Sequence, residues 1–324
     1  MIRRARGPLS VQVFRCGKPP SPPIGSAAVE VLRTPEERFA GLPDFDLEPR
    51  YLEIGGLRLA RVEAGEGEPV VFLHGEPTWS YLWRNVMPPV AEAGFRCIAP
   101  DLAGFGRSDK PADLGWYTYD RHVDLIRQLL AELGISNATL VAHDWGGPIG
   151  LRLAAENPGL FARLVVMDTG LFTGRQRMSD AWHRFRDFVE RTEDVPISML
   201  VRRACATDPG DEVAAAYDAP FPAPEFKVGP RAFPLILPLR PEDPGGAEGE
   251  SAFNRLRESP LPGLALWADG DPVLPFKTGE KVAAALSLPP PVKIEGASHF
   301  LQEDAGEVIG GHIADWLNSE TPSH

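Results

Sequence analysis

Short apolar segments that alternate with amphipathic ones are the feature that most constrains how this sequence folds. The first five apolar segments, predicted as strands, are residues 57–62, 69–73, 95–99, 138–142 and 164–167. Several are nearly continuous in apolar residues, which is typical of strands in a parallel sheet that helices cover on both faces. One helix is predicted by apolar residues spaced by three and four, at Val123, Ile126, Leu129, Leu130 and Leu133. Strands and helices in this alternation predict a doubly wound α/β sheet.

The alternation stops near Phe172. Residues 172–248 show helical stretches and no clear strand, and are interrupted by Pro220, Pro222, Pro224, Pro234 and Pro238. We interpret this stretch as an inserted helical cap. Strand-like segments return at 264–268 and 292–294, followed by a last amphipathic helix that ends near Trp316. The main domain is therefore expected to comprise residues 29–171 and 249–324. Residues 1–28 are rich in Pro, Gly and Arg without a hydrophobic period, which indicates a flexible N-terminal leader.

Composition limits the classes of partner. The 324 residues carry a formal net charge of -12, which opposes binding to nucleic acid or to anionic membrane surfaces. No run of about 18 apolar residues predicts a membrane span. Cys16, Cys97 and Cys205 are an odd number at wide spacings, which suits neither a disulfide framework nor a zinc site. We therefore expect a cytoplasmic protein with a small-molecule substrate, no metal and no organic cofactor, either a monomer or a small homo-oligomer.

The most informative motif is the segment 140–147, LVAHDWGG, in which an apolar strand runs into a helix of small residues. It resembles the nucleophile elbow of α/β-hydrolases, with Asp144 in the place of the nucleophile. An aspartate with an ordinary pKa of about 3.9 is already an anion at neutral pH and needs no base to attack. Attack on a saturated carbon displaces a leaving group and leaves an alkyl ester, whose hydrolysis does need a base. The simpler alternative is that Asp144 caps the helix that begins at Trp145.

Partners for this nucleophile follow later strands. Asp271 lies in a polar turn after the strand at 264–268, and His299 lies in a Gly-rich loop after the last strand. Both belong at the carboxyl edge of the sheet, in the chain order nucleophile, acid, histidine that is typical of this fold. A carboxylate that holds one imidazole nitrogen leaves the other free to take a proton from water. Asp168 also ends a strand on this edge and is kept as an alternative acid.

A strand also leads into the turn at 74–79, HGEPTW. In this fold that turn supplies the second backbone amide of the oxyanion hole. We expect the backbone N–H groups of Glu76 and Trp145 to stabilise the oxyanion that forms when water attacks the ester. An ordinary surface turn is the simpler alternative.

Taken together, these motifs resemble haloalkane dehalogenases. The segments that carry the resemblance are 74–84 (HGEPTWSYLWR), 101–111 (DLAGFGRSDKP), 142–147 (AHDWGG) and 216–222 (AYDAPFP). The resemblance runs from Leu32 through the tail. It implies that Asp144 displaces a halide from an alkyl halide, that His299 activates the water that hydrolyses the ester, and that no cofactor is needed. The products are an alcohol, a halide ion and a proton.

The resemblance also implies two side-chain N–H donors for the halide. Trp145, directly after the nucleophile, matches the first donor. The position after the His-Gly pair, which is Asn in one branch of the family, is Glu76 here, and an ionised carboxylate only accepts hydrogen bonds. The second donor is therefore expected from the cap, where Trp182 is the only tryptophan, although it could instead simply pack the cap. The branch with Glu at position 76 usually has Asn where this chain has Asp168, which leaves the acid open.

Two other functions fit the same fold. An epoxide hydrolase shares the Asp nucleophile but protonates the epoxide oxygen with cap tyrosines, and the predicted cap contains one, Tyr217. A catalytically inactive α/β-hydrolase would serve as a ligand-binding protein. All the expected catalytic positions are filled, and no serine occupies the elbow. The sequence therefore favours a haloalkane dehalogenase.

Overall fold

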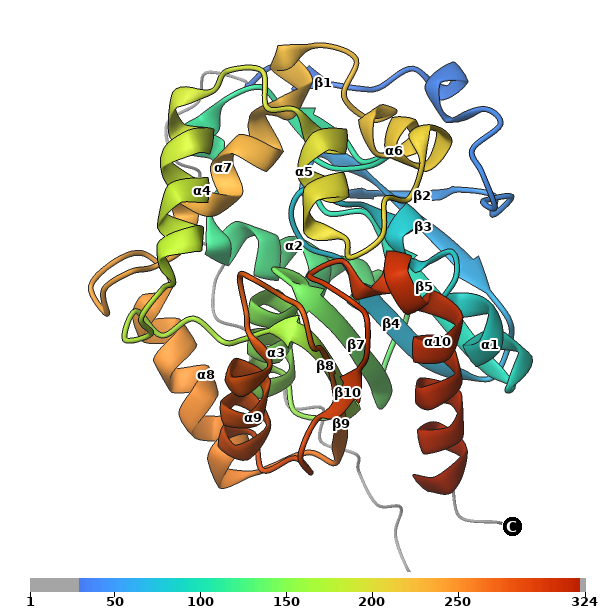
Figure 1. Cartoon of the computed structure of the whole chain (residues 1–324), viewed down its shortest axis with the longest axis vertical. Helices are drawn as coiled ribbons and strands as arrows, with labels where there is room; N and C mark the ends of the chain where they lie inside the picture. The colour runs from blue at the N-terminus through green and yellow to red at the C-terminus, as the bar shows by residue number, and fades with distance from the viewer. Residues whose placement is uncertain (1–28, 321–324) are drawn as a thin grey trace, which may run out of the picture.

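A central eight-stranded sheet organises the computed structural model, which describes residues 29–320 (Figure 1). The strands lie in the order β10-β9-β8-β7-β4-β5-β3-β2. Neighbours from β10 to β5 are parallel, whereas β3 pairs antiparallel with β5 and with β2. The bounds of these strands are β2 Arg50–Ile54, β3 Leu57–Ala64, β4 Glu68–Leu73, β5 Phe95–Pro100, β7 Ala138–Asp144, β8 Phe161–Thr169, β9 Gly263–Ala268 and β10 Val292–Ile294. The predicted doubly wound α/β sheet is confirmed.

Helices cover both faces of the sheet. On one face α1 packs against α10 and β5, and on the other α3 packs against α2, α8 and β7, with α9 against β8 and β9. The bounds are α1 Met87–Glu92, α2 Tyr119–Glu132, α3 Gly146–Glu156, α8 Gly246–Glu258, α9 Phe276–Ala285 and α10 Leu301–Glu320. The central strand β7 is therefore buried along most of its length, as its apolar sequence requires.

All seven strand-like segments predicted from the sequence are strands of this sheet. The edge strand β2 was not anticipated, because its burial follows no regular alternation, only its last residue is buried, and it pairs with one neighbour only. The last helix was expected to end near Trp316 and instead continues to Glu320. Residues 1–28, for which a leader was predicted, lie outside the described residues.

Four helices gather over the carboxyl ends of the parallel strands, at the top of Figure 1. They are α4 Asp180–Arg191, α5 Ile197–Ala204, α6 Asp211–Asp218 and α7 Val228–Ile236. No strand occurs in the described residues 172–248. The proposed cap ends at 248, two residues inside α8, which packs on α3 of the main domain.

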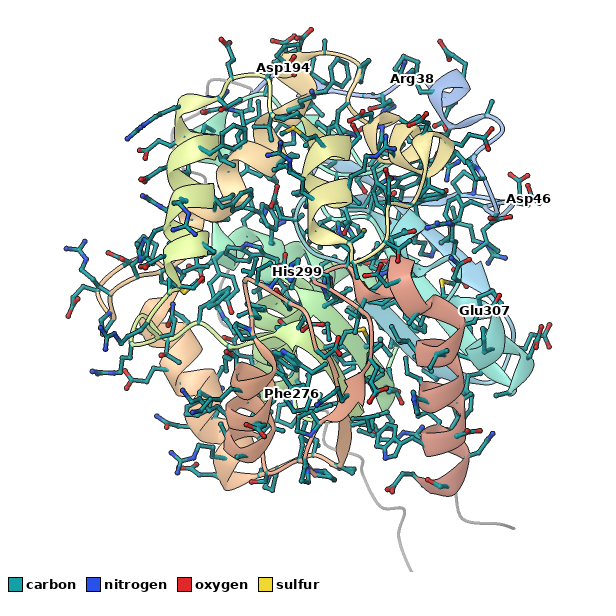
Figure 2. All side chains as sticks on the ribbon, viewed as in Figure 1. Arg38, Asp46, Asp194, Phe276, His299 and Glu307 are labelled. Atoms are coloured by element: carbon teal, nitrogen blue, oxygen red, sulfur yellow. The ribbon has the colours of Figure 1, made fainter. Side chains whose placement is uncertain are left out.

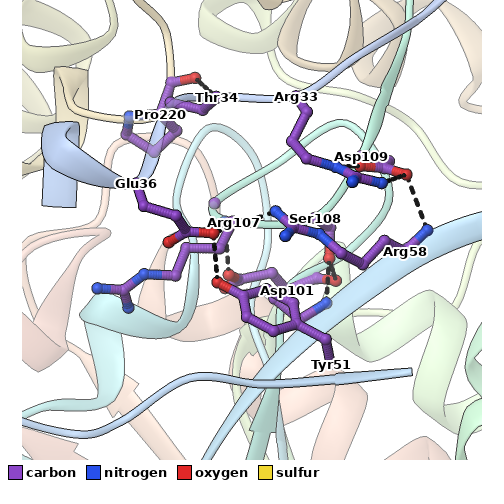
Figure 3. A network of polar contacts seen from close by, with 12 residues as sticks. Arg33, Thr34, Glu36, Tyr51, Arg58, Asp101, Arg107, Ser108, Asp109 and Pro220 are labelled. Carbon is purple, nitrogen blue, oxygen red and sulfur yellow. Dashed lines mark hydrogen bonds and ion pairs between the residues drawn. The ribbon is translucent and has the colours of Figure 1, made fainter. Parts of the chain in front are cut away.

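The first described segment connects the main domain to the cap. The short strand β1 Val31–Leu32 pairs with β6 Lys110–Pro111, and Arg33 makes two hydrogen bonds to Asp109 at 2.8 and 2.9 Å (Figure 3). The Thr34 hydroxyl donates to the carbonyl of Pro220 in the cap at 2.6 Å. This segment thus contacts both parts of the molecule.

None of the helices within residues 29–320 is both long and apolar enough to cross a membrane.

Candidate active site

Side chains from four distant parts of the sequence meet at the carboxyl edge of the sheet. Asp144 ends β7, Glu76 follows β4, Asp271 lies between β9 and α9, and His299 lies between β10 and α10. Figure 2 places His299 between the cap helices above and the sheet below. The order of the strands brings these loops together, because β4, β7, β8, β9 and β10 are consecutive neighbours.

Asp144 occupies a sharp bend between strand and helix. Its φ of 46° lies in the left-handed region, which costs energy for a residue with a side chain. A Cβ at Gly146 would lie 2.0 Å from the carbonyl oxygen of Leu73, and a Cβ at Gly75 would lie 2.1 Å from Oδ1 of Asp144. Both positions therefore require glycine, so that the strained residue can pack against β4 and the loop after it.

Two backbone amides hold the Asp144 carboxylate. The N–H of Glu76 donates to Oδ1 at 2.8 Å, and the backbone N–H of Trp145 also lowers the pKa of this carboxylate. Burial raises the pKa of Asp144, but the ion pair with nearby His299 and the backbone amides lower it more, so the net shift is downward. Asp144 is therefore an anion at neutral pH, with 20% of its side chain exposed.

His299 lies between two carboxylates. Its Nδ1 is 2.8 Å from Oδ2 of Asp271, and its Nε2 is 3.7 Å from Oδ2 of Asp144. Burial lowers the pKa of His299, but the charge of Asp271, its hydrogen bond to the ring and the nearby Asp144 carboxylate raise it well above 6.5. The ring is therefore cationic while both aspartates are ionised.

The two candidate acids differ in what they contact. Asp271 accepts from His299, and its Oδ1 accepts the backbone N–H groups of Val273 and Leu274 at 2.7 and 3.0 Å. Burial raises the pKa of Asp271, but the charge and hydrogen bond of His299 lower it more. Asp168 is fully buried and makes no hydrogen bond to His299. The structure thus places Asp271, rather than the alternative Asp168, on the imidazole.

Glu76 has a protonation state that the sequence argument did not anticipate. Its side chain is buried, and burial together with the negative charge of Asp144 raises its pKa well above the usual value. From the sequence alone, Glu76 is expected to be ionised and to accept hydrogen bonds only. Burial beside a second carboxylate instead favours the neutral form of Glu76, because two adjacent anions out of water repel each other.

Aromatic rings surround Trp145. Its ring centroid lies 5.7 Å from Tyr119, 5.5 Å from Phe172 and 4.9 Å from Phe233, so helices α2 and α7 and the start of the cap contact it. Trp182 is buried on α4, which packs against α7. Within residues 29–320 neither indole N–H donates a hydrogen bond, so both remain free for a ligand.

One part of the site was missed from the sequence. Glu303, in the first turn of α10, accepts two hydrogen bonds from Arg84 at 2.6 and 2.7 Å and one from the hydroxyl of Tyr217 in the cap. The next residue, Asp304, accepts the backbone N–H of Ser298 at 2.9 Å. The loop that carries His299 is therefore fixed to the main domain and to the cap. Acidic residues at a helix start are so common that nothing in the sequence distinguished these two.

Comparison with known proteins identifies the family. The family model for the alpha/beta hydrolase fold matches residues 68–306. A haloalkane dehalogenase from Psychrobacter cryohalolentis is 38% identical over 299 residues, covering 90% of this chain and 99% of its own. Another, from Mycobacterium marinum, is 39% identical over 297 residues, covering 89% of this chain and 100% of its own. The chain belongs to the haloalkane dehalogenase family.

A solved haloalkane dehalogenase shares the whole architecture. The tetrameric structure of DpaA from Paraglaciecola agarilytica NO2 matches with a TM-score of 0.83 at 35% identity, covering 91% of this chain and 100% of its own. The α/β-hydrolase fold and the dehalogenase resemblance predicted from the motifs are therefore both confirmed. As a haloalkane dehalogenase, the protein is a hydrolase that acts on carbon–halide bonds.

Proposed function

We propose that this dehalogenase hydrolyses alkyl halides in two steps through an alkyl ester of Asp144. In the first step a carboxylate oxygen of Asp144 attacks the carbon that bears the halogen, and the carbon–halogen bond breaks with its electrons on the halide. The observation that carries this proposal is the ionised Asp144 at the elbow, held by the amides of Glu76 and Trp145 and facing His299. Every group that acts is a side chain or backbone amide of this chain, or water.

Trp145 and Trp182 are the proposed halide ligands. Each is buried and has an indole N–H without a hydrogen-bond acceptor among the described residues. A halide that forms away from bulk water needs donors, and a neutral donor releases it more easily than a full positive charge would. The raised pKa of Glu76, which lies beside Asp144, favours its uncharged form, and that form does not repel the departing anion.

The second step uses His299 as a base. Forming the ester removes the negative charge of Asp144, one of the two charges that raise the pKa of His299. The pKa of the ring therefore falls after alkylation, and the ring releases its proton to the solvent, as the proton product of the reaction, and becomes able to accept one from water. The hydroxide formed attacks the ester carbonyl, and the amides of Glu76 and Trp145, already aimed at Asp144, stabilise the oxyanion. Collapse of this intermediate releases the alcohol and restores the Asp144 carboxylate.

Tyrosine contacts argue against an epoxide hydrolase. All five tyrosine hydroxyls of the chain donate to other acceptors: Tyr51 to Glu36, Tyr81 to the Pro43 carbonyl, Tyr117 to the Pro111 carbonyl, Tyr119 to the Pro148 carbonyl and Tyr217 to Glu303. No tyrosine hydroxyl is therefore free to protonate an epoxide oxygen. A non-catalytic binding protein is equally disfavoured, because the ionised nucleophile and the carboxylate–imidazole pair are both assembled.

Halide and proton release from chloro-, bromo- and iodoalkanes, measured beside a panel of epoxides, tests the function. We expect halide release without epoxide opening. Asp144→Ala should abolish turnover, whereas the control Asp46→Asn, an exposed residue at the edge of the molecule in Figure 2, should leave it unchanged. Sustained turnover by Asp144→Ala would refute the assignment of the nucleophile.

Halide binding has its own test. Bromide or iodide should quench tryptophan fluorescence of the wild type, and Trp145→Phe or Trp182→Phe should weaken this binding and slow halide release. Trp316→Phe, on the last helix, serves as the matched control. Unchanged halide affinity in Trp182→Phe would assign that side chain to packing alone.

A cytoplasmic location and a monomeric or small homo-oligomeric state complete the proposal. Light scattering on the purified full chain measures the assembly, and fractionation of cells that express it measures the location.

A further inference from the structure

Asp168 is an acidic side chain in the site that the two-step mechanism leaves without a role. It lies near the end of β8 with a φ of 36°, a left-handed conformation that is strained for a residue with a side chain. Its side chain is completely buried. The backbone N–H of Ala268 donates to Oδ2 at 3.3 Å, whereas Oδ1 receives no hydrogen bond from any donor group of the described residues.

The carboxylate of Asp271 can accept one more hydrogen bond than it receives from the groups described above. Oδ1 of Asp271 accepts two backbone N–H groups, and Oδ2 accepts one hydrogen bond, from Nδ1 of His299. An ionised carboxylate offers about four acceptor positions, so one position on Oδ2 is left. Asp168 lies close to Asp271: the backbone N–H of Ala268, three residues before Asp271, donates to Asp168, and the Asp271 carboxylate acts on the Asp168 carboxyl. Two carboxyl groups form a hydrogen bond only if one of them carries a proton.

We propose that Asp168 is a positioning residue that keeps its proton and donates it from Oδ1 to Asp271, in support of the hydrolytic step of the proposed function. Asp271 is the partner that stays ionised, because His299 and two backbone amides already hold its charge. The bond satisfies the one polar atom of Asp168 that is otherwise buried without a partner. It also helps to fix the Asp271 carboxylate, and therefore the ring of His299.

The electrostatic surroundings agree with this assignment. Burial and then the negative charge of Asp271 raise the pKa of Asp168 well above its usual value, and the positive charge of His299 only partly offsets them. Asp271 and His299 are the two charged groups that act on Asp168. In the ester intermediate His299 becomes neutral, which removes the one charge that favours ionisation of Asp168. The proton is therefore held most firmly during the step in which His299 must stay oriented.

Infrared spectroscopy tests the proton directly and does not depend on turnover. The full chain is labelled with ¹³C at the aspartate carboxyl carbons, so that the neutral Glu76 does not contribute. Near neutral pH the wild type should show the carbonyl band of one protonated aspartate, and Asp168→Asn should lack it. Absence of the band in the wild type, or its persistence in Asp168→Asn, would overturn the proposal.

Rapid-quench kinetics test the positioning role. Asp168→Asn keeps an N–H donor toward Asp271 and should retain most of the rate of ester hydrolysis, whereas Asp168→Ala should lose roughly tenfold. The halide burst of the first step should be unchanged in both variants. The positioning role is overturned if Asp168→Asn and Asp168→Ala lose the same fraction of the rate of ester hydrolysis while both melt at the temperature of the wild type, because the donor toward Asp271 would then have no effect. Absence of halide release by the wild type would instead contradict the proposed function, and the infrared result would still stand.

Discussion

Breaking the buried ion pair between Arg84 and Glu303 from one side should cost more stability than breaking an exposed pair of this protein. Both side chains are almost fully buried, with 4% and 3% exposed, and two parallel hydrogen bonds join them. Glu303→Gln keeps the shape but leaves a buried guanidinium without a counter-charge, and the amide cannot replace both acceptors. Breaking a buried pair in this way costs about 3–5 kcal/mol.

Chemical denaturation measures this cost. We expect the free energy of unfolding of Glu303→Gln to fall by about 3–5 kcal/mol, and the melting temperature to fall by roughly 6–15 °C. Asp124→Asn is the matched control, because its pair with Arg127 leaves 45% of the arginine and 55% of the aspartate side chain exposed. Its cost should stay below about 1 kcal/mol.

A double variant separates the charge from the packing. Arg84→Met combined with Glu303→Leu removes both charges together and should regain much of the stability lost in Glu303→Gln. The reasoning is wrong if Glu303→Gln unfolds within about 1 kcal/mol of the wild type, or if the double variant is less stable than Glu303→Gln.

Three further predictions concern the site. Asp271→Asn should slow ester hydrolysis by roughly 10³–10⁴-fold while the halide burst persists; rapid-quench kinetics check this, and an equal loss in the burst would contradict it. Gly75→Ala should abolish turnover while the protein stays folded, because the added Cβ would lie 2.1 Å from Oδ1 of Asp144. A halide assay measures the turnover and a circular dichroism spectrum checks the fold; near-normal activity would contradict the predicted clash. The pKa of His299 is raised on folding, so its stabilising effect is complete below pH 6.5 and is lost as the pH rises through the folded value. Relative to His299→Gln, the wild type should therefore be more stable at about pH 6 than at about pH 9, and a constant difference would refute the shift.

The sequence predicted the sheet and the elbow because both depend on local patterns. Continuous apolar segments identify strands that are covered on both faces, and small residues around Asp144 identify a tight bend. The strand β2 escaped prediction because an edge strand with exposed side chains has no such pattern.

The choice between two acids depended on side-chain direction. Asp168 and Asp271 both follow strands that end at the same edge of the sheet, so the order of elements could not separate them. In the structure the turn after Asp271 supplies two backbone N–H groups that orient its carboxylate toward His299. The raised pKa of Glu76 was equally hidden, because it depends on burial beside Asp144. Protonation and orientation are set by tertiary contacts that no local pattern records.

The central claim is that Asp144, and not water, attacks the carbon that bears the halogen. A single turnover in H₂¹⁸O, with enzyme in excess over a bromoalkane, tests it most directly. The oxygen of the first alcohol should come from the Asp144 carboxylate and be ¹⁶O, and mass spectrometry of the peptide that contains Asp144 should find ¹⁸O there. An ¹⁸O-labelled alcohol from the first turnover, with Asp144 unlabelled, would mean that water attacks directly and would contradict the account.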